Sequence, residues 1–93
     1  MIRAFADKDT EKLFNGRRAK KCSPELSDRA LQKLLMLNAA NRISDLRMPP
    51  GNHLEALVGD RKGQYSIRIN DQYRICFVWT AAGPRDIQIV DYH

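Results

Sequence analysis

The chain has 93 residues, 43% of them hydrophobic, which suffices for one small domain over residues 1–93 and leaves no room for a second core. Sixteen Lys and Arg against eleven Asp and Glu give a net charge of +5, which favours nucleic acid, an acidic protein or an anionic surface as the partner. No apolar run is long enough to span a membrane, and the N-terminus lacks the apolar core of a signal peptide, so we expect a cytoplasmic protein without membrane contact.

The first part of the chain is expected to form a strand and a short helix. Residues 2–5 are apolar enough for a first strand. Asp7 or Asp9 is suited to cap a helix that runs through Phe14, with Gly16 as its stop signal.

A basic run follows this helix. Seven of the sixteen Lys and Arg lie in the first 22 residues. Such a run is either a solvated loop between helices or a contact to RNA phosphates. Its members are Arg17, Arg18, Lys20 and Lys21.

A longer helix is predicted after the basic run. Ser23 followed by Pro24 is a hydroxyl cap with proline in the first turn. The helix should pack one apolar stripe against a sheet. This stripe contains Leu26, Ala30, Leu34 and Leu37, joined by Leu31 and Leu35.

Residues 53–58 are expected to form a strand that precedes a glycine-bracketed turn over residues 59–63. This turn would present Arg61 and Lys62 at its tip. Alternation along the strand predicts Leu54, Ala56 and Val58 on one face and His53, Glu55 and Leu57 on the other.

Residues 64–79 have the period-two pattern of a β-hairpin. Matching the apolar faces predicts a three-residue loop at Asn70, Asp71 and Gln72, in which Asn70 or Asp71 is able to adopt a positive φ. The predicted cross-strand pairs are Ile69 with Tyr73, Ile67 with Ile75 and Tyr65 with Phe77.

The same register places Arg68 opposite Arg74 on the other face of the hairpin. Like charges in this position repel each other mildly, so an anion is expected over the pair unless both arginines are simply solvated. A last strand over residues 85–92, with Ile87 and Ile89 inward, completes the sheet. The predicted fold is α+β, with two to three N-terminal helices on one face of a largely antiparallel sheet of about five strands, whose other face is partly open.

The residues that favour acid–base chemistry lie at the end of this strand. Asp91, Tyr92 and His93 can donate, accept and orient protons, although a polar C-terminus also arises by chance. His53 and Glu55 begin a strand that a closed meander would bring to the same sheet. Together with the arginines, these groups are the inventory for metal-free RNA cleavage.

Metal and nucleotide cofactors are not expected. Cys22 and Cys76 are the only cysteines, far apart in the sequence, and two free thiols fit a reducing compartment. No Cys/His spacing indicates a zinc site, and there is no glycine-rich phosphate loop.

Several motifs together resemble the HigB branch of the RelE superfamily of bacterial toxins. They are the Gly-Asp-Arg-Lys-Gly turn, Asn70, the Tyr73 and Arg74 pair, and the terminal Asp-Tyr-His. The resemblance extends over the whole chain and implies the RelE-like fold.

The resemblance also implies a function: a toxin of a type II toxin–antitoxin system that acts as a ribosome-dependent mRNA endonuclease. A helix-turn-helix antitoxin of the HigA type would restrain it and bind operator DNA. Arg74 would stabilise the phosphate, Asp91, Tyr92 and His93 would transfer and orient protons, and Asn70 would support the substrate or the loop. Some relatives have histidine at the position of Glu55, which leaves the choice between His53 and Glu55 open.

Two other functions remain compatible with the sequence. A toxin of the same fold can act by binding alone, as gyrase poisons do, and a basic protein of this size can bind the ribosome or RNA without cleaving it. The terminal Asp91, Tyr92 and His93 favour the nuclease, because binding alone does not need such a cluster.

Overall fold

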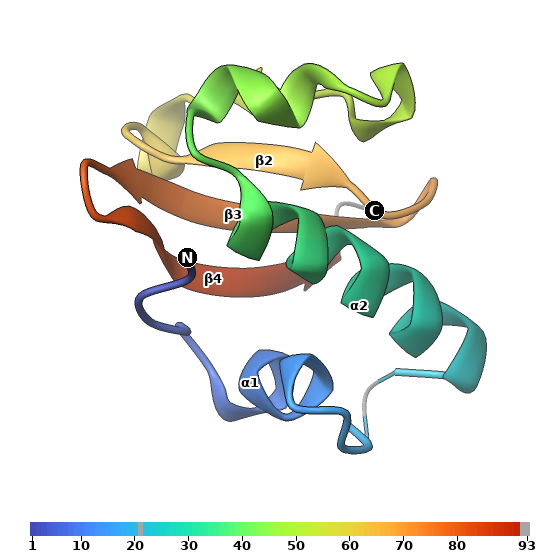
Figure 1. Cartoon of the computed structure of the whole chain (residues 1–93). Coiled ribbons are helices and arrows are strands. Elements are labelled where there is room, and N and C mark those ends of the chain that lie inside the picture. The colour runs from blue at the N-terminus through green and yellow to red at the C-terminus, as the bar shows by residue number, and fades with distance from the viewer. Residues whose placement is uncertain (21, 92–93) are drawn as a thin grey trace.

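The computed structural model describes residues 1–20 and 22–91. Two α-helices lie on one side of a sheet, and three short 3-10 helices lie in the connections (Figure 1). The sheet is antiparallel throughout, with the strand order β1-β2-β3-β4. The elements are α1 (Lys8–Phe14), α2 (Pro24–Ala39), η1 (Ile43–Arg47), η2 (Pro50–Asn52), β1 (Glu55–Ala56), η3 (Gly59–Arg61), β2 (Tyr65–Arg68), β3 (Tyr73–Thr80) and β4 (Gly83–Asp91).

Both helices begin at side-chain caps. The Oδ1 atom of Asp7 accepts the backbone N–H of Thr10 at 2.7 Å, which selects Asp7 rather than Asp9 as the cap of α1. Ser23 caps α2 by accepting the N–H of Leu26 at 3.1 Å. These bonds satisfy N–H groups that have no partner within the helix.

The hairpin register is confirmed. Tyr65 pairs with Phe77, Ile67 with Ile75, and Arg68 with Arg74, while the N–H of Ile69 donates to the carbonyl of Tyr73. The expected positive φ in the loop is wrong, since neither Asn70 nor Asp71 has one. Instead, the Asn70 side chain closes the turn by accepting two backbone N–H groups, and this removes the need for a left-handed residue.

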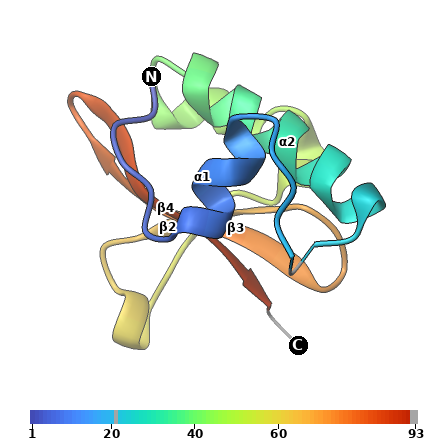
Figure 2. The ribbon, with the colours of Figure 1, turned by 90° about the horizontal axis from the view of Figure 1, so that it is seen from below.

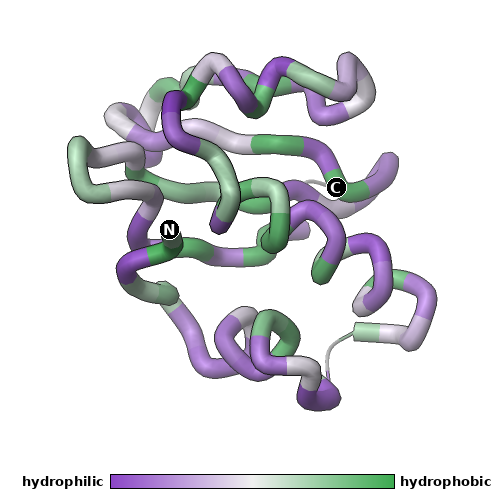
Figure 3. Tube along the Cα trace, viewed as in Figure 1, coloured by the Kyte–Doolittle hydropathy of each residue, from purple (hydrophilic) through white to green (hydrophobic). Residues whose placement is uncertain are grey.

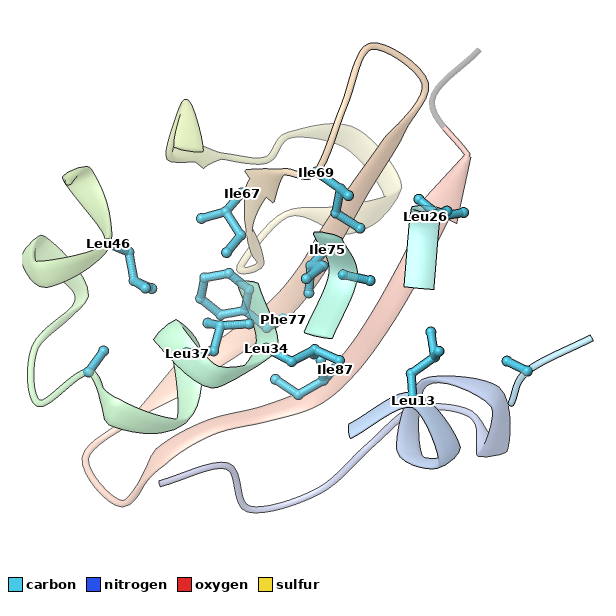
Figure 4. Close-up of a cluster of buried hydrophobic side chains, with 13 residues drawn as sticks. Leu13, Leu26, Leu34, Leu37, Leu46, Ile67, Ile69, Ile75, Phe77 and Ile87 are labelled. Atoms are coloured by element: carbon cyan, nitrogen blue, oxygen red, sulfur yellow. The ribbon is translucent and has the colours of Figure 1, made fainter. Parts of the chain in front are cut away.

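The core lies between the helices and the sheet. Figure 4 shows Leu34 and Leu37 of α2 packed near Phe77 and Ile87 of the sheet. In Figure 3 the strand interiors are mostly hydrophobic, whereas the turn between β2 and β3 is hydrophilic. The predicted stripe of α2 is buried at Leu26, Ala30, Leu34 and Leu37, and Leu35 is exposed.

The expected first strand over residues 2–5 is wrong. Phe5 forms one parallel bridge with Ile87, and the N–H groups of Arg3 and Ala6 donate to carbonyls of β4 at 2.8 Å. A bulge in β4 interrupts further pairing: Cys76 faces Gln88 but Val78 faces Arg85, which leaves the positive-φ residue Asp86 as the extra residue. The described sheet therefore has four strands rather than about five.

The expected strand over residues 53–58 is reduced to Glu55–Ala56, which pair with Ser66 and Tyr65 and so lie on opposite faces, as predicted. Leu57 is the buried residue, whereas Ala56 and Val58 are exposed. His53 has φ 44° and ψ 57°, so the chain turns at this residue instead of extending.

Asn52 fastens the loop before β1 to α2. It is fully buried, its Nδ2 donates to the carbonyls of Leu46 and Met48, and its Oδ1 accepts Nζ of Lys33 at 2.5 Å. Burial, with the nearby charge of Arg29, lowers the pKa of Lys33. One amide side chain therefore satisfies two loop carbonyls and one ammonium group.

We expect Asn52→Ala to lower the free energy of unfolding by about 2 kcal/mol, because it leaves the buried Leu46 carbonyl and two partly buried groups without their partner. Urea unfolding of the variant measures this loss. Asn41→Ala is the matched control, since Asn41 is exposed in the same part of the chain. Equal stability of both variants would show that the buried amide does not hold the loop.

Candidate functional site

Arg74 lies on the face of the sheet that is turned away from the helices. Its Nε donates to Oγ of Ser66 at 2.8 Å, and its Nη2 donates to the backbone carbonyl of His53 at 2.5 Å. Nη2 also lies 3.9 Å from Oε1 of Glu55. Arg74 is only 9% exposed, so contacts from three segments hold its guanidinium in place.

The face around Arg74 is less open than the sequence predicts. Residues 53–64 return across the sheet edge, and Figure 2 shows η3 (yellow) on the side of the sheet opposite α1 and α2. As a result Ser66 and Cys76, which pair with each other across β2 and β3, are fully buried on this outer face. Burial raises the pKa of the Cys76 thiol, against the opposite effect of the Arg61 and Arg74 charges.

Arg68 faces Arg74 across the two strands, as predicted, but its contacts differ. Its Nε donates to the carbonyl of Asn70 at 3.1 Å, and its Nη2 forms an ion pair with Asp71. The side chain of Arg68 is 35% exposed. The contacts with Asn70 and Asp71 of the hairpin loop therefore hold the Arg68 guanidinium near the surface rather than beside Arg74.

Arg61 and Lys62 differ in how far they reach the solvent. The guanidinium of Arg61 lies against Oε1 of Gln64 at 3.1 Å and of Gln88 at 3.4 Å, so it folds back over the sheet. Lys62 is exposed, as predicted for the tip of the turn. Gln88 pairs with Cys76, which places Arg61 on the same face as Arg74.

His53 contributes its backbone to the Arg74 site. The residue is exposed, and its carbonyl is the atom that accepts Nη2 of Arg74. Glu55 pairs with Ser66, so it shares the face of Arg74, and 57% of its side chain is exposed. The structure thus brings Glu55 and the His53 carbonyl to the guanidinium.

Asp91 lies at the end of β4 on the other face. It pairs with Tyr73, next to the Arg74 and Val90 pair, and alternation turns Tyr73 and Asp91 towards the helices. Asp91 also lines a hollow of about 430 Å³ with Asp7, Asp9 and other residues of the α1 side, and it accepts Nε2 of Gln72 at 3.0 Å. Tyr92 and His93, the two other predicted proton-transfer residues, lie outside the described residues.

Asn70 has a defined contact set. Its Oδ1 accepts the N–H groups of Gln72 at 2.9 Å and Tyr73 at 2.8 Å. These bonds fix the loop that carries the partners of Arg68. Of the two roles that the sequence analysis leaves open, Asn70 therefore has the contacts of a loop-stabilising residue.

Two polar partners of the site, Ser66 and Gln88, were not predicted from the sequence. Both alternate with inward isoleucines, Ser66 before Ile67 and Gln88 between Ile87 and Ile89, and this pattern was available as a signal. Alternation does not reveal that Ser66 contacts Arg74 and that Gln88 contacts Arg61, because each pair joins different segments of the chain.

The basic run after α1 lies apart from this face. Arg17, Arg18 and Lys20 are exposed and line a hollow of about 690 Å³ between α1 and α2, while Ala19 is buried among them. Lys21, the last predicted member of the run, lies outside the described residues.

Two properties hold for residues 1–20 and 22–91. Within them, no three His, Cys, Asp or Glu residues are grouped so that they could hold a metal ion. No helix in this part of the chain is long and apolar enough to cross a membrane.

Comparisons with known proteins give the family. A profile described as "RelE-like toxin of type II toxin-antitoxin system HigB" matches residues 3–93. Toxin HigB-1 of Vibrio cholerae is 44% identical over 80 residues, which cover 85% of this chain and 84% of that protein. An uncharacterized protein of Haemophilus influenzae is 50% identical over 46 residues, which cover 50% of this chain and 46% of that one.

The fold has a counterpart among solved structures. A chain of the YoeB-YefM complex from Staphylococcus aureus matches with a TM-score of 0.64 at 17% identity, over 100% of this chain and 95% of that one. At this identity the likeness concerns the fold alone, and it confirms the predicted RelE-like architecture. The profile and the Vibrio relative agree with the motifs in the hairpin and the last strand. The chain therefore belongs to the HigB-like family of RelE-like toxins of type II toxin–antitoxin systems.

Proposed function

We propose that this toxin is an endoribonuclease that cleaves translated mRNA on the ribosome. The fixed guanidinium of Arg74 is the observation that carries the proposal. A donor group that is already oriented stabilises charge that develops in a transition state, because it needs no rearrangement during the reaction. Family membership supports the toxin role, and the guanidinium supports phosphate chemistry.

The proposed reaction needs no metal. A base removes the proton of the ribose 2′-hydroxyl, the 2′-oxygen attacks the adjacent phosphorus, and the bond to the 5′-oxygen breaks as that oxygen takes up a proton. Arg74 would stabilise the negative charge of the phosphorane, and Tyr92 and His93 would transfer and orient the protons, with Asp91 supporting them from the helix side of the sheet. Positioning of the message by the ribosome would supply much of the rate.

The remaining site residues would surround the message. Arg68 and Lys62 offer charge near the surface, and Arg61 offers a guanidinium on the same face as Arg74. Glu55 lies beside Arg74 and, with His53, is the second candidate for proton transfer. Asn70 would act through the loop that it closes.

The proposed partners follow from the family. A helix-turn-helix antitoxin of the HigA type would restrain the toxin and connect it to operator DNA, and the ribosome with its mRNA would be the target. The YoeB-YefM complex is an example of a RelE-like fold in a two-component assembly. The cytoplasm, where translation occurs, is the proposed location.

Primer extension on a defined message tests the proposal after brief induction of the toxin. We expect new 5′ ends inside reading frames when translation proceeds, and none when initiation is blocked. Intact message together with growth arrest would overturn the nuclease and favour a toxin that acts by binding gyrase or the ribosome. Cleavage of naked RNA at the same sites would overturn ribosome dependence.

A further inference from the structure

The strongest unassigned feature of the outer face is the hydroxyl of Ser66. Ser66 is fully buried in the middle of the sheet, where an unpaired hydroxyl is unfavourable. Its Oγ accepts Nε of Arg74 at 2.8 Å, and its backbone carbonyl lies 3.5 Å from Nη2 of the same residue. The buried hydroxyl therefore has the guanidinium as its partner.

Two contacts to different nitrogens fix the orientation of a guanidinium group, whereas a single contact does not. An arginine side chain has several rotatable bonds, and a single hydrogen bond leaves the planar group free to turn about that bond. Ser66 holds Nε from β2, and the carbonyl of His53 holds Nη2 from the turn before β1. Without the hydroxyl, Nε loses its contact at 2.8 Å, whereas the His53 carbonyl, the Ser66 carbonyl at 3.5 Å and the Glu55 carboxylate at 3.9 Å all contact Nη2.

The anchor at Ser66 is also the more rigid of the two. Ser66 lies between Glu55 of β1 and Cys76 of β3 in the ladder, so its backbone is paired on both sides. The His53 carbonyl belongs to an exposed residue in a turn. A group held by the centre of a sheet is positioned more accurately than one held by a loop.

We propose that Ser66 is a positioning residue that sets the plane of the Arg74 guanidinium for the phosphate. This inference rests on the proposed nuclease function. Misplacement of a catalytic group by about 1 Å can cost about a hundredfold in rate, and loss of one of two anchors should cost part of that. Ser66→Ala should lower the single-turnover rate of mRNA cleavage about tenfold, with the half-saturating toxin concentration changed by less than about twofold.

A double-mutant cycle with programmed ribosomes tests the inference. Ser66→Ala should slow cleavage in the wild-type chain and have no further effect when Arg74 is already alanine, because a positioning residue acts through its partner. Asn38→Ala is the matched control: Asn38 is half-buried on α2, and its Oδ1 accepts the N–H of Ile2 at 3.0 Å on the helix side of the sheet. This control should match Ser66→Ala in loss of stability and retain the wild-type rate.

A measurement that does not need cleavage separates this inference from the proposed function. The NMR signal of the Arg74 Nε–H group should exchange with water faster in Ser66→Ala than in the wild type. If the wild-type protein cleaves no message, the nuclease proposal fails, whatever the NMR result. If it cleaves, then equal rates for Ser66→Ala and the wild type, an equal loss of rate in Asn38→Ala, additive effects in the cycle, or unchanged exchange would overturn the role of Ser66.

Discussion

Replacement of Arg74 by alanine is expected to lower the rate of message cleavage by about 10²- to 10³-fold and to abolish growth arrest. This is the range observed when one preorganised donor is removed from a transition state. Arg74→Lys should recover only part of the loss, because an ammonium group carries the charge without the planar donors that contact Ser66 and the His53 carbonyl. Single-turnover cleavage on programmed ribosomes measures both variants.

The same substitution should also cost stability, because Arg74 is nearly buried. Alanine leaves the Ser66 hydroxyl and the His53 carbonyl without their donor, which should cost about 1–3 kcal/mol. Activity must therefore be measured below the midpoint of unfolding. Arg85→Ala is the control, because Arg85 pairs with Val78 on the same face, away from Arg74, and is about half exposed. A folded Arg74→Ala variant that still arrests growth would refute the assignment.

Replacement of His93 by alanine is the second large expected effect. A positioned acid or base contributes about 10²- to 10⁴-fold, so the variant should lose activity by a factor in that range. Single-turnover cleavage on programmed ribosomes measures the loss, and a His93→Ala variant that cleaves at the wild-type rate would exclude this imidazole from proton transfer.

His53→Asn gives the comparison for His93→Ala. Asparagine tolerates the left-handed backbone of residue 53 and retains the carbonyl that contacts Arg74, so only the imidazole is lost. We expect this variant to keep most of its activity. If instead His53→Asn loses the activity while His93→Ala retains it, the imidazole of His53 is the acid or base.

Local patterns predicted the hairpin well. Alternation determined the register of β2 and β3, because a slip of one residue would expose Ile67 and Ile75. The caps at Asp7 and Ser23 were predictable for a similar reason, since a cap is a contact between residues three positions apart. In each case the residues that decide the structure are close in sequence.

The errors came from contacts between distant segments. Residues 2–5 were expected as a strand, but the bulge at Asp86, about eighty positions away, interrupts their pairing with β4. The burial of Arg74 depends on the return of residues 53–64 over the outer face, and the hairpin sequence contains no sign of it. The sequence therefore indicated Arg74 as a candidate site residue but not the groups that hold its guanidinium.

The two edges of the sheet, at β1 and β4, affect the tendency of the protein to aggregate at high concentration. A long unpaired strand is a template for another chain, and repeated pairing of this kind leads to aggregation. Here β1 offers only two residues on one side, and on the other the segment around Phe5 occupies backbone groups of β4. Among the described residues, β1 thus offers a second copy only a short edge, and the segment around Phe5 protects the middle of β4 from strand-to-strand pairing.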